Sequence, residues 1–144
     1  MNSNRKLILE NIVQDLRSIT NPKLGKISTR PEDFTRLART AFPFVQVEIT
    51  DESKEDIAME WRLSTLTIAI TVHLDGKSRT EKTQSQLAGI IDAIETVIER
   101  DRTRGGVAQL TELLEIGDMQ ETGYPTVAQT LSIGVQYTYS RGNT

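Results

Sequence analysis

The chain has 144 residues, a length typical of one domain, and its 26% charged and 37% hydrophobic residues are an ordinary composition for a soluble globular protein. It has no cysteine, which excludes disulfides and thiolate chemistry and favours the reducing cytoplasm. It also has neither an apolar run long enough to cross a membrane nor the apolar centre of a signal peptide, so we expect no membrane contact. The net charge of −3 argues against a protein that coats nucleic acid, which would carry an excess of lysine and arginine.

The N-terminal part of the chain predicts a helix followed by a loop. Residues 4–20 carry apolar side chains at helical spacing, and Asn21–Pro22 ends this helix because the residue before a proline disfavours helical geometry. The loop at 21–30 is expected to finish in a short strand around Lys26–Arg30. Residues 31–42 are compatible with a helical turn or with an irregular crossing loop.

The next segment predicts a strand and an acidic connection. From Pro43 to Ile49, apolar and polar residues alternate as they do in a half-buried strand. Residues 50–58, TDESKEDIA, follow as a solvated connection to a second strand. Their negative charge is a common means of preventing edge-to-edge pairing of strands.

Residues 59–76, MEWRLSTLTIAITVHLDG, form the most unusual segment. Apolar residues alternate on both sides of Ser64–Thr65, but the two sets are out of phase by one residue. A bulge at Ser64–Thr65 would let one bent strand keep a single apolar face. A strand of roughly 16 residues reaches about 53 Å. Part of it is therefore expected to project beyond the core, or to curl, and to meet a partner.

The C-terminal half predicts a second helix and a closing strand. Residues 78–100 carry an apolar stripe, and Ser78 and Glu81 have the spacing of a capping box. Residues 107–123 are compatible with a helical turn or with a strand. Residues 127–139 alternate as a strand, and 140–144 are expected to fray.

These elements together predict the α+β class. The strands that are neighbours in sequence are joined by short turns, which favours antiparallel pairing. We therefore expect a single domain over residues 1–144, with an antiparallel sheet that contains a long bent strand and a hairpin, and two main helices packed on one face.

No set of residues supports catalysis, a cofactor or a metal site. The sequence DGKS at 75–78 is half of a phosphate-binding loop, but Thr71 stands where that motif needs a glycine. His73 is the only histidine, and Asp75 is its only evident partner, which is too little for a catalytic or metal-binding constellation. We expect His73 to face outward or to lie in an interface.

Two surfaces are open to more than one interpretation. The face with Thr65, Thr67, Ala69 and Thr71 is small and uncharged, which suits packing against another surface but also an ordinary exposed strand. Basic residues form two groups in loops: Arg100, Arg102 and Arg104 near Glu99 and Asp101, and Lys23, Lys26, Arg30, Arg36 and Arg39. Such groups can contact phosphates, although most are solvated or paired with acids.

The order of segments carries a family resemblance. A first helix, RKLILENIVQDL, precedes a loop and the segment FPFVQVEI at 42–49; an acidic hairpin leads into MEWRLSTLTIAITVHL, a helix at 81–100 follows, and LSIGVQYTYS closes the chain. This pattern, over residues 4–140, resembles the tail terminator, or tail-completion, proteins of long-tailed bacteriophages. Residues 101–126 match least well.

The resemblance implies a structural part of a virion rather than an enzyme. It implies a ring, usually of six copies, on the last ring of the tail tube, which stops tube growth and offers a surface to the head-tail connector protein while DNA passes through the lumen. It implies a location at the head-proximal end of the tail, after assembly in the host cytoplasm. From their positions, we expect subunit or tube contacts from Glu52, Lys54, Glu55, Trp61, Thr67, Thr71 and His73. We expect Arg100, Arg102 and Arg104 to face the lumen or the connector.

Two alternatives remain open from the sequence. One is a small cytoplasmic α+β protein, ligand-binding or regulatory and dimeric, with a pocket between sheet and helices. The other is a neck or head-completion protein of the same viruses, which would bind on the portal side. A compact dimer would favour the first alternative over a ring.

Overall fold

The computed structural model confirms the α+β class. It describes residues 4–30, 42–75, 81–106, 108–118, 120–121 and 126–140. The helices within these ranges are α1 (Asn4–Arg17) and α2 (Glu81–Arg100), and the strands are β1 (Ile27–Ser28), β2 (Phe44–Asp56), β3 (Trp61–Asp75), β4 (Leu110–Ile116), β5 (Gln120–Glu121) and β6 (Thr126–Ser140). None of the described helices has the length and apolar character needed to cross a membrane.

The described strands form one mixed sheet that is mostly antiparallel. The order is β1-β2-β3-β6-β4, and β5 adds to β6 beside this path. The last strand of the chain, β6, therefore lies inside the sheet between β3 and β4. The short strand expected around Lys26–Arg30 is confirmed as β1, but it pairs parallel to β2, so the sheet is not purely antiparallel.

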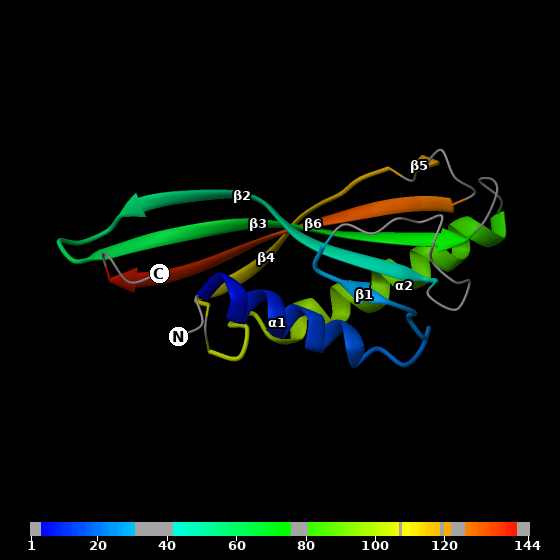
Figure 1. Ribbon diagram of the computed structural model, residues 1–144, viewed down its shortest axis with the longest axis horizontal. Helices are drawn as coiled ribbons and strands as arrows, with labels where there is room; N and C mark the ends of the chain where they lie inside the picture. The colour runs from blue at the N-terminus through cyan, green and yellow to red at the C-terminus, as the bar shows by residue number, and fades with distance from the viewer. Residues whose placement is uncertain are drawn as a thin grey trace.

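Both described helices cover the same face of the sheet (Figure 1). The side chains buried between the two layers follow the helical and strand periods of the sequence. From α1 they include Ile8, Ile12 and Leu16; from α2, Leu87, Ile90 and Ile94; from β3, Leu66, Ile68, Ile70 and Val72; and from β6, Leu131, Ile133 and Val135. Since the apolar stripes of both helices meet one face of the sheet, the predicted arrangement is confirmed.

One end of the sheet projects beyond the helices, as the length of the third strand predicted. Figure 1 shows the hairpin end of β2 and β3, together with the end of β6, extending past α1 on the left. We call this three-stranded projection the arm. Its strands remain paired to the end, because Asp56 of β2 pairs with Arg62 and Trp61 of β3 pairs with Ser140 of β6.

The predicted bulge at Ser64–Thr65 is wrong. Strand β3 pairs with β6 from Trp61 to Asp75 without a shift in register, and the irregularity lies in β2 between Ile49 and Asp51. An extra residue in β3 would disturb the ladders on both of its sides. β1 pairs with β2 only at Val45 and Gln46, so β2 has a single strand partner at Ile49–Asp51 and the irregularity there disturbs one ladder. Because β3 keeps its register, Trp61 lies on the face opposite to the helices.

The acidic segment 50–58 also differs from expectation. It is not a loop, since β2 continues through Asp56 and the chain reverses only after that residue. Main-chain pairing with β3 holds these residues extended. The polar side chains are tolerated because those of residues 51 and 53–56 are exposed, while Glu52 is half-buried and ion-paired with Arg5. The strand and the hairpin are thus longer than the alternation of apolar residues indicated.

The remaining sequence predictions have mixed outcomes. Residues 110–116 form strand β4, so the helical-turn alternative for this part is wrong. Ser140 is paired in β6, so the expected fraying does not begin there, and 141–144 lie outside the described residues. The segment 31–41, the partial phosphate-loop sequence at 76–78 and the capping residue Ser78 lie outside them as well.

Candidate interaction surfaces

A polar cluster joins the arm to α1 on the helix-covered face. Arg5 donates from Nε and Nη2 to the two carboxylate oxygens of Glu52, each at 2.6 Å. These hydrogen bonds hold the pKa of Glu52 below its usual value. Lys54 Nζ donates to Tyr139 Oη at 2.6 Å and lies 4.6 Å from the centre of that ring. Two of the expected contact residues, Glu52 and Lys54, are therefore engaged within their own chain.

We expect Arg5→Gln to lower the free energy of unfolding by about 1 kcal/mol at pH 7, a discounted value because the Arg5 side chain is partly exposed. The lowered pKa of Glu52 means that the pair stabilises the fold above the ordinary carboxyl pKa and ceases to do so as the pH falls through the folded value. Urea denaturation should thus show a smaller difference at pH 3. Arg102→Gln, at an exposed position in the loop after α2, is the control; an equal loss there would contradict the prediction.

The end of the arm is an exposed apolar tip. Ile57, Met59 and Trp61 have exposed fractions of 52%, 92% and 48%. Glu55 beside them is also exposed. Trp61 and Glu55 were expected contact residues, and their exposure is compatible with that role. Ile57 and Met59 were missed because Met59 was assigned to the apolar face of a continuous strand, whereas it lies in the turn.

The threonines of β3 lie on the sheet face opposite to both described helices. Thr67 and Thr71 are half-buried, and Ala69 between them is buried. The hydroxyl groups of Thr71 and Thr130 on β6 are hydrogen-bonded at 3.0 Å. Among the described residues these form a row of small, uncharged side chains, a composition that suits contact with another surface.

His73 lies on the same face but is not the outward-facing residue that its position suggested. Its side chain is only 6% exposed, and its ring centre is 5.6 Å from that of Phe44, the neighbouring residue on β2. Burial lowers the pKa of His73 to about 4. A neutral, buried imidazole offers little surface to a partner protein, so we assign it to the packing of this face.

The three arginines at the end of α2 and in the loop after it do not form one surface. Arg100 and Arg102 are exposed, but Arg104 is fully buried. Arg104 donates to Asp15 Oδ2 on α1 at 2.6 Å and to the carbonyl of Ile98 at 2.6 Å, and it also binds the carbonyl of Asp101. Arg104 therefore caps the C-terminal end of α2 and ties it to α1. A role toward a lumen or a connector stays a proposal for the other two.

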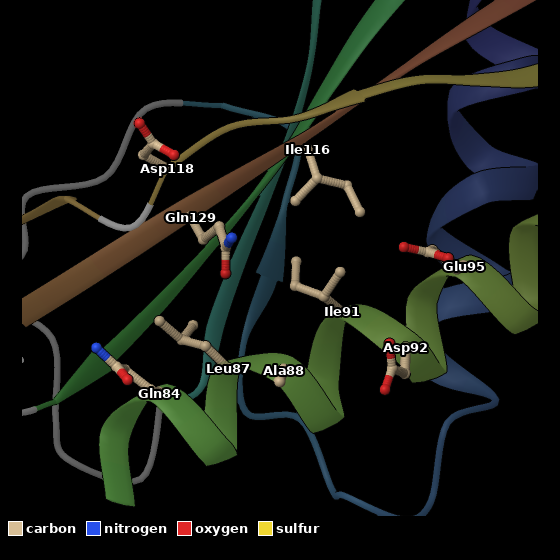
Figure 2. A pocket seen from close by; sticks show the side chains of 9 residues that line it. All are labelled: Gln84, Leu87, Ala88, Ile91, Asp92, Glu95, Ile116, Asp118 and Gln129. Atoms are coloured by element: carbon tan, nitrogen blue, oxygen red, sulfur yellow. The ribbon is translucent and has the colours of Figure 1, made fainter. Parts of the chain in front are cut away.

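A cleft of about 490 Å³ lies between α2 and the β4–β6 side of the sheet. Figure 2 shows Ile91 and Ile116 pointing toward each other across it, with Leu87 at its floor. Three carboxylates line the same cleft: Asp92, Glu95 and Asp118. We call this hollow the α2–β4 cleft. Such a cleft is what the ligand-binding alternative requires.

The electrostatics of the α2–β4 cleft limit its chemistry. Partial burial raises the pKa of Glu95, and the negative charges of Asp92 and Glu99 add to this effect. Within the described ranges, no group of three or more histidine, aspartate or glutamate side chains is close enough to hold a metal ion. The cleft is thus an apolar floor with a negative rim, suited to an interaction with a cationic or apolar group.

Comparisons with known proteins find a similar fold in a solved structure but no matching protein-family model or curated protein. A solved structure described as the virion of a native gene transfer agent (GTA) particle contains a similar chain, with a TM-score of 0.52 and 12% sequence identity. The match covers 89% of this chain and 92% of that chain. At this identity the likeness shows a shared fold over nearly the full length of both chains.

Proposed function

We propose that this chain, which has the fold of a chain in a gene transfer agent virion, is itself a structural protein of a virion. More specifically, we propose a tail terminator: a ring of about six copies that caps the tail tube, stops its polymerisation and offers a surface to the head-tail connector. The observation that carries the proposal is the match over 89% of the chain, together with the arm, which projects beyond the helices (Figure 1) and carries exposed apolar side chains.

The physical argument for self-assembly concerns the apolar tip. Isolated exposed apolar residues are normal, but Ile57, Met59 and Trp61 are all exposed within one hairpin end, which favours an interaction site. A ring requires a head-to-tail contact in which two different patches of the subunit meet. The arm supplies one patch of such a contact, and the threonine face of β3 is a separate uncharged surface that suits contact with a neighbouring copy. The proposed role is structural, with no substrate turned over.

The proposal is tested by native mass spectrometry and negative-stain imaging of the purified full-length chain. We expect rings of about six copies with a central hole, either in concentrated solution or on purified tail tubes. Rings that bind portal-side proteins and leave tube length unchanged would identify a neck protein instead. A compact dimer without rings, stabilised by a small metabolite, would overturn the proposal in favour of the ligand-binding alternative.

We expect Thr67→Lys to weaken ring assembly at least tenfold, equivalent to about 1.4 kcal/mol, because a long cationic side chain would stand on the threonine face. Ser85→Lys, at an exposed position of α2, is the matched control and should leave assembly unchanged. Sedimentation velocity over a concentration series measures both. If assembly of the Thr67 variant equals that of wild type, the threonine face is solvated and is not a subunit interface.

A further inference from the structure

The tip of the arm is a hairpin end with exposed apolar side chains and neighbouring carboxylates. The amides of Ile57 and Ala58 donate to the carbonyl of Trp61 at 3.2 and 3.4 Å, which closes the hairpin. Ile57, Met59 and Trp61 are its exposed apolar side chains. Two exposed carboxylates, Glu55 and Glu60, flank them. A partner surface for this tip therefore needs an apolar floor and a positive rim.

The chain carries such a surface between α1, the turn that follows α1, and β1. Two adjoining hollows of about 370 and 260 Å³ share Arg17 and Ile27, and we call them together the α1–β1 groove. The apolar residues of the groove are Leu9, Val13, Leu16, Ile19, Leu24 and Ile27. Of the described residues that line it, Lys6, Arg17 and Lys23 are basic and Glu10 is acidic.

The tip cannot fill the groove of its own chain. Figure 1 shows the hairpin end of the arm pointing away from α1, with the turn after α1 and β1 toward the opposite end of the molecule. Another hollow, the α2–β4 cleft, has Asp92, Glu95 and Asp118 at its rim, so it would repel the acidic tip. Charge therefore selects the α1–β1 groove over the α2–β4 cleft.

We propose that the hairpin tip of one copy docks in the α1–β1 groove of the next copy. This inference rests on the proposed ring, and it names the two patches that the ring would join. Met59 and Trp61 would lie on the apolar floor, while Glu55 and Glu60 would meet Arg17 and Lys23 at the rim. Because tip and groove are different patches, each copy offers one of each, and the contact repeats from copy to copy until the ring closes.

Disulfide trapping tests the contact directly, since the chain has no cysteine of its own. Full-length Met59→Cys and Lys23→Cys variants are mixed in equal amounts and oxidised. A disulfide forms only where the two Cα atoms approach to within about 7 Å. We expect a cross-linked dimer that contains one copy of each variant. The control mixture pairs Met59→Cys with Gln84→Cys, which lines the α2–β4 cleft and should cross-link at least tenfold less.

The pattern of products separates this inference from the proposed ring. A chain carrying both Met59→Cys and Lys23→Cys should give a ladder that ends at the size of the ring. A ladder that ends at two copies would support the contact and overturn the ring. Rings seen by imaging without the expected disulfide, or with a stronger one to Gln84→Cys, would overturn the contact and leave the ring. Absence of both association and cross-links would overturn both.

Charge reversal gives a second test that requires no oxidation. Lys23→Glu and Glu55→Lys should each weaken association at least tenfold in sedimentation velocity, and the two variants mixed together should associate more strongly than either alone. Association of the wild type should also weaken as salt is raised, because the charges at the rim lie near solvent. Equal association of all three proteins at low salt would overturn the proposed contact.

Discussion

Replacing Arg104 with methionine is expected to lower the free energy of unfolding by about 3 kcal/mol, the largest effect we expect from one exchange outside the apolar core. Its guanidinium is fully buried and joins Asp15 of α1 to the carbonyls of Ile98 and Asp101 at the end of α2. Methionine has a similar length but no donor. The exchange would leave a carboxylate and the last carbonyls of a helix without their partner.

Urea denaturation of Arg104→Met and Arg102→Met measures this effect. Arg102 is exposed in the same loop, so its exchange should change the unfolding free energy by less than about 0.5 kcal/mol. If Arg104→Met does not fold, Arg104→Lys provides the measurement, because lysine keeps the positive charge and loses only the planar array of donors of the guanidinium group. A loss below about 1 kcal/mol for the methionine variant would contradict the assigned role of Arg104.

The second large effect is a loss of folding stability at acidic pH. The protein is expected to lose about 2 kcal/mol of stability between pH 7 and pH 5 through His73 alone. Burial lowers its pKa to about 4 in the folded chain, against an ordinary value of 6.5. The unfolded chain therefore binds a proton in this range and the folded chain does not. This contribution to stability is fully present above pH 6.5 and is lost as the pH falls toward 4.

The variant His73→Gln isolates this contribution, because glutamine keeps hydrogen-bonding groups but does not titrate. We expect the difference in unfolding free energy between wild type and variant to shrink by about 2 kcal/mol from pH 7 to pH 5 in urea denaturation. His73 is the only histidine, and comparison with the variant subtracts the carboxyl groups common to both proteins. A difference that is constant with pH would show that the imidazole protonates as easily in the folded chain as in the unfolded one.

Periodicity determined the elements that pack in the core. The spacing of Ile8, Ile12 and Leu16 predicted the first helix, and the regular alternation after residue 126 predicted the last strand. Local periodicity succeeds here because one face of each element is buried, so that burial and sequence period agree. The α+β class and the projecting length of the third strand followed from the same patterns.

The sequence was ambiguous wherever an element lacked a buried face. In the arm, β2 continues through an acidic segment because β3 supplies its main-chain partners. The side chains of this segment give no indication of that pairing in the sequence. The out-of-phase apolar residues around Ser64 predicted a bulge, yet the observed register places Trp61 on the outer face instead.

The candidate site residues were likewise misplaced wherever their surroundings depend on contacts between distant parts of the chain. From its position in a charged loop, Arg104 was expected to face a lumen or a connector, but the approach of Asp15, 89 residues earlier, buries it. Glu52 was expected at an interface, and Arg5 holds it within the chain. The sequence by itself determined which segments are apolar, that the third strand is long and that no thiol chemistry is available. Only the tertiary structure decided which charges are paired and which apolar side chains remain exposed, because both depend on contacts between residues far apart along the chain.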